Sequence, residues 1–213
     1  YVPSIPLSKL HDLDYYSIQS IDMVEVNGVG IGSAGQKMFT FLIRGESDSA
    51  DDDIIIITKT AKPSVVMPYV NANPFPEGHI RNEAMRCVLW QRAMQVNADP
   101  LLGHFEYNEN NFYACELSPY EENVNLDEIH SSKEFLSVLS QMGQATAKIH
   151  AISDRDADAS LVPYSADREI LGVIAGKEGQ FFNEVCDFAL SYAKIVENDY
   201  KVFLEELKNE DII

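Results

Sequence analysis

Three glycines at a fixed spacing constrain this sequence more than any other feature. Gly30, Gly32 and Gly35 form the pattern G-x-G-x-x-G, which lets backbone amides approach phosphate oxygens because no Cβ intervenes. A dinucleotide-binding fold requires a helix directly after such glycines. Residues 37–43 are instead rich in β-branched and aromatic types. The pattern therefore predicts an antiparallel hairpin of residues 23–26 and 37–43, and the alternative to phosphate binding is an ordinary flexible turn.

A lysine near the next strand extends this pattern. Residues 54–58 are all β-branched, which predicts a strand buried on both faces, and Lys59 follows them directly. In protein kinases, a strand lysine pairs with ATP phosphates beneath a glycine-rich lid. A lysine at the end of a strand can also simply face the solvent. The acidic loop over residues 45–53 lengthens the glycine-to-lysine spacing at a small entropic cost.

A carboxylate on the following helix is expected to be the partner of this lysine. A helix is predicted from about Gly78 to Val96, and Glu83 lies at the edge of its apolar stripe, where it can face the sheet. The helix dipole alone also favours a glutamate in the first turn. Further along, the strand that ends in Glu116 and Leu117 resembles the segment of kinases that leads from a strand into the hinge. The backbone of that segment forms hydrogen bonds with adenine.

The order of the remaining elements predicts the fold class. A hairpin of residues 101–107 and 112–117 follows the first helix. Helices are then expected from a capping box at residues 131–134, over residues 167–175, and over residues 181–207. The most economical packing is an α+β, protein-kinase-like fold, with a five-stranded antiparallel sheet and one helix followed by a helical lobe.

Three parts of the chain are expected from this order. Residues 1–21 form a leading segment, residues 22–119 a nucleotide-binding sheet domain that resembles a kinase N-lobe, and residues 120–213 the helical lobe. Tyr1, in place of an initiating methionine, indicates a fragment or a processed product.

Charge, cysteine content and hydropathy limit the partners. The chain has 16 basic and 34 acidic residues, a net charge of −18. Such a surface repels phosphate backbones, so general nucleic-acid binding is not expected. Three cysteines without a C-x-x-C motif fit reduced thiols in a cytoplasmic protein. No apolar run is long enough to span a membrane, and no signal peptide is recognised.

No metal site is predicted within the chain. Residues 154–158 have the spacing that begins a calcium-binding loop. However, Ala159 stands where such a loop has glycine and Ser165 where it has its closing glutamate, so a solvated loop is expected. The histidines show neither the H-E-x-x-H spacing nor a cluster with cysteines, which gives no zinc site.

Several separated motifs resemble, in the same order, a bacterial protein family known as domain of unknown function 2252. The likeness runs from about Asp22 to the C-terminus. The segments that carry it are residues 26–35, 59–65, 91–95, 99–103 and 147–151. That family is similar to protein-kinase-like and aminoglycoside-phosphotransferase-like proteins, in a permuted order that places the catalytic-loop and metal segment before the glycine loop.

The resemblance implies a phosphotransferase-like module that binds ATP. The implied nucleotide-binding residues are Gly30, Gly32, Ser33, Gly35, Lys59, Glu83, Glu116 and Leu117. Mg²⁺ would be held by an upstream segment of the same protein, and the acceptor would be a small molecule or a protein. The chain has no GDxHxxN-like or DFG-like stretch, so no catalytic residue is assigned and the chain alone is expected to be inactive. A non-catalytic, pseudokinase-like interaction module and a dinucleotide-binding oxidoreductase are the alternatives.

Overall fold

The computed structural model describes residues 2–3, 20–27, 33, 35–45, 47–69, 80 and 82–209. The chain divides into two compact units, Tyr1–Ala166 and Asp167–Ile213, and each is described by itself. The domain boundary expected after residue 119 stays a prediction.

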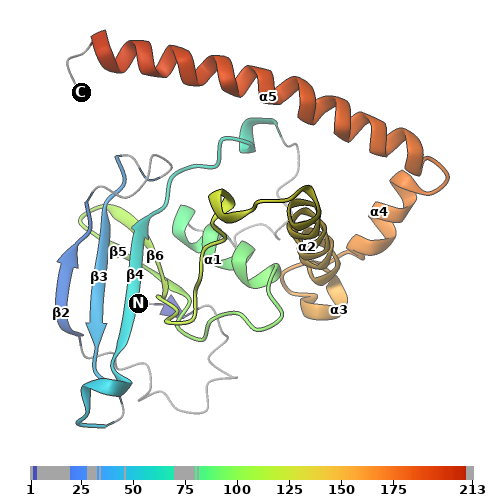
Figure 1. Ribbon diagram of the computed structural model, residues 1–213. Coiled ribbons are helices and arrows are strands. Elements are labelled where there is room, and N and C mark those ends of the chain that lie inside the picture. Colours follow the sequence, from blue (N-terminus) through green and yellow to red (C-terminus); the bar gives the residue numbers. More distant parts are fainter. Residues whose placement is uncertain are drawn as a thin grey trace. The chain divides into compact units, whose positions relative to one another are not determined.

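An antiparallel sheet organises the first unit (Figure 1). Its described strands are β1 (Val2–Pro3), β2 (Ser20–Glu25), β3 (Met38–Ile43), β4 (Ile54–Thr60), β5 (Gly103–Tyr107) and β6 (Asn110–Glu116). They lie in the order β1-β5-β6-β4-β3-β2, and every neighbouring pair is antiparallel. The five expected strands are therefore confirmed. The sixth, β1, was not expected, because two residues are too few to show the alternation that identifies a strand.

Both predicted hairpins form. Strand β2 pairs with β3, with Met23 opposite Phe41, and β3 begins at Met38, so a strand rather than a helix follows Gly35. In the β5–β6 hairpin the turn tightens to Asn108 and Glu109, which have φ of 47° and 63°. Positive φ at both central residues is the geometry whose twist matches that of the flanking strands.

The two faces of β4 differ in burial. Ile56 is buried and packs in a cluster with Ile43, Leu101 and Ala114, whereas Ile55 on the opposite face is 39% exposed. The expectation that this strand is buried on both faces is therefore wrong. The strand belongs to an antiparallel sheet, in which alternate side chains have different environments. By the same alternation, Lys59 shares its face with Ile55.

Helix α1 (Glu83–Ala93) packs against β5 and β6 (Figure 1). It is shorter than the expected range of 78–96, of which residues 78, 79 and 81 lie outside the described part. Asn82 sets the start, since its side-chain oxygen accepts a hydrogen bond from Met85 N at 2.8 Å. Val88, on the side of the helix that faces the protein, is 1% exposed.

Helices follow the sheet in the first unit. Helix α2 (Ser132–Ile152) begins at the predicted capping box, formed by Ser131 and Glu134. Helix α3 (Arg155–Asp158) is a single turn in the segment predicted to be a loop. The loop prediction missed this turn because Asp154, interpreted there only as a solvated acid, caps it by accepting a hydrogen bond from Asp156 N at 2.9 Å.

Short turns and two further helices complete the described chain. The 3-10 helices are η4 (Ala50–Asp52), η5 (Met67–Tyr69) and η6 (Leu126–Glu128). Helices α4 (Ala166–Ile174) and α5 (Glu178–Asn209) are separated at Gly176, whose φ of 75° is the left-handed conformation that commonly ends a helix. Among the described helices, none is both long enough and apolar enough to cross a membrane.

Candidate functional site

The side chain of Lys59 reaches the turn that joins β2 to β3. Lys59 is the penultimate residue of β4, where it lies between Met38 on one neighbouring strand and Tyr113 on the other. Its Nζ donates a hydrogen bond to Ser33 Oγ at 2.6 Å. The lysine and the serine proposed from the glycine pattern are therefore in direct contact.

The described part of this turn requires a glycine. Gln36 N donates to the carbonyl oxygen of Ser33 at 3.0 Å, and Gly35, between them, has a φ of 68°. This left-handed conformation is readily adopted only without a Cβ. The other two glycines of the pattern, Gly30 and Gly32, lie outside the described residues.

Backbone contacts tie the end of the turn to the end of β4. Lys37 N donates to Thr60 Oγ1 at 3.1 Å, and Thr60 N donates to Lys37 O at 3.0 Å. Thr60 is only 8% exposed, so water competes little for these bonds. The strand that carries Lys59 and the exit of the turn are thereby held together.

A second lysine, Lys62, lies at the same turn. A Cβ placed on Gly35 would be 3.8 Å from Lys62 Nζ. Neither Lys59 nor Lys62 forms an ion pair with any residue in the described part of the chain. Sequence reasoning missed Lys62 because it follows the strand, where neither helical nor strand periodicity indicates the direction of a side chain. Its position three residues after Lys59 was the available signal.

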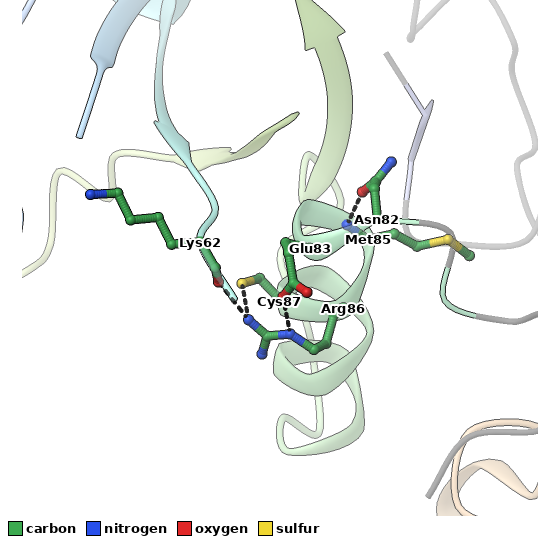
Figure 2. Close-up of polar contacts among 6 residues, drawn as sticks. All are labelled: Lys62, Asn82, Glu83, Met85, Arg86 and Cys87. Atoms are coloured by element: carbon green, nitrogen blue, oxygen red, sulfur yellow. Dashed lines mark hydrogen bonds and ion pairs between the residues drawn. The ribbon is translucent and has the colours of Figure 1, made fainter. Parts of the chain in front are cut away.

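Glu83 interacts with an arginine rather than with Lys59 (Figure 2). Its Oε2 accepts a hydrogen bond from Arg86 Nε at 2.6 Å. Arg86 Nη2 in turn donates to the carbonyl oxygen of Lys62 at 3.1 Å. The contact expected between Glu83 and Lys59 is not formed, because an arginine one helical turn away offers a charge-assisted bond on the same helix.

Figure 2 also shows how this contact orients Lys62. The carbonyl group of Lys62 faces the Arg86 guanidinium, while its side chain extends away from α1. The helix therefore holds the backbone of Lys62 and leaves its ammonium group free to reach Gly35.

Three weakly acidic groups lie together between α1 and the sheet. Burial raises the pKa of the Tyr113 phenol, and the neighbouring Cys115 and Cys87 raise it further. Burial also raises the pKa of the Cys87 thiol, partly opposed by Arg86. The pKa of Cys115 is likewise raised by burial, with contributions from Asp99 and Glu121. Tyr113 is also the cross-strand neighbour of Lys59, so this group of side chains lies next to the strand that carries the lysine.

The proposed hinge residues have their amide groups engaged by protein acceptors. Glu116 N donates to Asp99 Oδ2 at 2.7 Å, and Leu117 N donates to Ile55 O at 2.7 Å. An adenine at this edge would therefore have to use their carbonyl oxygens or the residues that follow.

A cavity of about 700 Å³ opens at the C-terminal end of α1, between this helix and residues 151–162. Arg92 lines it, and its Nη2 lies 2.9 Å from Asp158 Oδ2, which also lines it. Since this cation is already paired, the cavity offers less to an anionic ligand than the turn does. Within the described residues, no group of three His, Cys, Asp or Glu side chains is arranged to hold a metal ion.

These features define an α+β protein with an antiparallel sheet, in which two lysines meet a glycine-containing turn. The chain belongs to the family described as uncharacterized proteins conserved in bacteria, domain of unknown function 2252, whose model matches residues 1–206. The membership of this family expected from the motifs is thus confirmed. A search of curated proteins found no match, and a search of solved structures found none either.

Proposed function

We propose that this chain is the nucleotide-binding portion of a kinase-like phosphotransferase whose acceptor is a small molecule or a protein. The observation that carries the proposal is the 2.6 Å contact between Lys59 Nζ and Ser33 Oγ, beneath the turn of an antiparallel hairpin. In kinases, a strand lysine and a glycine-rich loop approach ATP phosphates from this arrangement.

The described groups fit phosphate oxygens. An ammonium group donates to them directly, and Gly35 lets the backbone approach closely because it has no Cβ. On binding, Lys59 would exchange the Ser33 hydroxyl for a phosphate oxygen, a stronger acceptor because it is charged. The net charge of −18 repels anions at long range, so recognition has to come from these short-range contacts.

Mg²⁺ would neutralise charge on the transferring phosphates. The described residues include no group of ligands that fits it, so we place those ligands in a segment N-terminal to the glycine turn, in the permuted order that the family resemblance implies. The three free cysteines, Cys87, Cys115 and Cys186, fit the cytoplasmic location that we propose for such an enzyme.

Calorimetric titration of the purified chain with ATP tests this function. We expect weak but saturable binding, weakened about tenfold or more in Lys59→Ala, since a hydrogen bond to a charged group contributes about 1.5–3 kcal/mol. The matched control is Lys133→Ala, which removes an exposed lysine from the first turn of α2. If millimolar ATP produces neither heat nor a thermal shift, the nucleotide-binding proposal fails.

The second candidate is a non-catalytic module with the same nucleotide site. The observation that favours it is the pairing of Glu83 with Arg86, because kinase catalysis requires a lysine–glutamate ion pair and Glu83 does not form one with Lys59. Assays of phosphate release and acceptor labelling, on the protein together with its upstream segment, would distinguish the phosphotransferase from the non-catalytic module. Activity that Lys59→Ala abolishes favours the enzyme. Nucleotide binding without turnover favours the module.

The dinucleotide-binding alternative requires a helix where β3 lies and is not carried further.

A further inference from the structure

We propose that Lys62 is a second phosphate-binding cation of this site, positioned by Arg86, and that the site therefore selects ligands with two or more linked phosphate groups. The inference deepens the proposed nucleotide binding and rests on it. It assigns to the site a nucleoside diphosphate or triphosphate rather than a monophosphate.

The first observation is the meeting of two ammonium groups at one short turn. Lys59 Nζ contacts Ser33 Oγ at 2.6 Å, and Lys62 Nζ lies 3.8 Å from the place that a Cβ on Gly35 would occupy. Ser33 and Gly35 belong to the same turn, closed by the bond from Gln36 N to Ser33 O. One turn is thus approached by cations from two points of the chain.

The second observation is that the backbone of Lys62 is constrained in two ways. Pro63 follows it, and a residue before proline is restricted to extended conformations. In addition, the Lys62 carbonyl oxygen, in the peptide bond to Pro63, accepts a hydrogen bond from Arg86 Nη2 at 3.1 Å. The side chain of Lys62 therefore extends away from α1 in a defined direction, although the residue lies in a loop.

The third observation is that Arg86 is itself fixed. The Arg86 side chain is only 15% exposed, and its Nε is bonded to Glu83 Oε2 at 2.6 Å. Figure 2 shows the resulting series from Glu83 through Arg86 to the Lys62 carbonyl, with the lysine side chain directed away from the helix. Glu83 and Arg86 thus act as positioning residues for Lys62.

These contacts determine the class of ligand. Two cations without carboxylate partners among the described residues lie at the turn, and their mutual repulsion favours an anion whose charge is spread over more than one group. A single phosphate can satisfy one ammonium group well. A diphosphate presents separate oxygens to both, so the second lysine contributes only when the second phosphate is present.

Titration of ATP, ADP and AMP into the wild-type chain, Lys59→Gln and Lys62→Gln tests this inference. We expect Lys62→Gln to weaken ATP and ADP binding about tenfold, consistent with the loss of one charge-assisted bond, and to change AMP binding less than about twofold. Lys62→Arg should retain the preference for ATP over AMP, because it keeps the cation. Lys62 is exposed, so the two Lys62 variants should melt at the wild-type temperature, and Lys133→Gln is the matched control.

The positioning role has its own measurement. Arg86→Gln keeps Lys62 but removes the charged donor to its carbonyl oxygen, so it should reduce the ratio of ATP affinity to AMP affinity. A merely structural loss would lower both affinities together. If the wild type binds ATP but Lys62→Gln binds ATP and AMP as the wild type does, the role of Lys62 is excluded while the proposed function stands. If the wild type binds no nucleotide, both proposals fail.

Discussion

Lys59 and Ser33 are separated by 26 residues in sequence, yet Lys59 Nζ donates to Ser33 Oγ at 2.6 Å. The bond joins the penultimate residue of an inner strand to the turn between two others. Because the serine hydroxyl is the one described acceptor of this ammonium, a bound phosphate would compete with it directly.

A double-mutant cycle on Ser33→Ala and Lys59→Met measures the energy of this contact. We expect the two changes to be non-additive in the free energy of unfolding by about 1 kcal/mol, the usual net value of a hydrogen bond. The measurement is urea unfolding of the four proteins without ligand. Additive effects would show that the bond contributes nothing to the stability of the turn.

Nucleotide affinity should respond differently to the same two changes. Ser33→Ala should leave ATP binding equal or slightly stronger, since the ammonium no longer exchanges one acceptor for another. Lys59→Met should weaken it. A loss of ATP affinity in Ser33→Ala as large as that in Lys59→Met would instead indicate that the hydroxyl itself binds the ligand.

The loop before β4 contains a second position that requires glycine. A Cβ on Gly45 would lie within 2.6 Å of Asp52 Oδ1 and closer still to the Asp52 carbonyl oxygen. We expect Gly45→Ala to lower the free energy of unfolding by about 2 kcal/mol, in the range of substitutions that force packed backbone to move. Thermal and urea unfolding measure the change.

Gly143 provides the matched control for this substitution. It lies within α2, and a Cβ there would meet nothing within 4 Å. Gly143→Ala should therefore raise the free energy of unfolding by about 0.5–1 kcal/mol, as expected for alanine in a helix interior. Equal effects of the two alanines would contradict the close approach at Gly45.

Sequence patterns predicted those elements whose physics is local. The β2–β3 hairpin was predictable because alternation on both sides of the glycines excludes a helix after Gly35. The α2 start was predictable because its capping box involves residues three apart, Ser131 and Glu134. Lys59 could be placed near the turn because the kinase-like pattern fixes its strand position.

The remaining features depended on which of several possible contacts forms in the folded chain, and a single sequence does not reveal that choice. Glu83 could pair with a lysine across the sheet or with Arg86 one turn along, and the nearer arginine forms the bond. The direction of Lys62 follows from a contact between its backbone and α1, which no periodicity encodes. The two faces of β4 looked alike because isoleucine fills both, although only one is fully buried.

Helix caps give a way to separate stability from binding. Asn82 caps α1 through Met85 N at 2.8 Å, and Ser131 caps α2 through Glu134 N at 3.2 Å. Replacing either residue by alanine should lower the free energy of unfolding by about 1 kcal/mol. Only Asn82→Ala should also weaken ATP binding, because α1 begins at Glu83, which holds Arg86.

Calorimetric titration with ATP, at a temperature where both cap variants are folded, makes the comparison. Equal ATP affinities in the two variants would show that the start of α1 does not influence the site.

Alkaline pH should destabilise the folded chain through the half-buried Cys87, Tyr113 and Cys115. Burial raises the pKa of all three above the ordinary values of 9.0 for the thiols and 10.0 for the phenol. As pH rises through 9, thiols of the unfolded chain lose protons that the folded chain keeps, so the unfolded state is increasingly favoured. The stabilisation is therefore complete below about pH 9 and declines as pH rises toward the folded-state pKa values.

Urea unfolding under reducing conditions at pH 8, 9 and 10 tests this expectation. The midpoint should fall with pH in the wild type, and it should fall less in a Cys87→Ala/Cys115→Ala variant, in which the two thiols no longer titrate. Cys186→Ala, in α5, is the control that removes a thiol outside this group. Tyr113→Phe should flatten the part of the decline nearest pH 10, because it keeps the ring but removes the ionising hydroxyl. A midpoint that is constant or rises between pH 8 and 10 would show that these side chains are accessible to water in the folded protein.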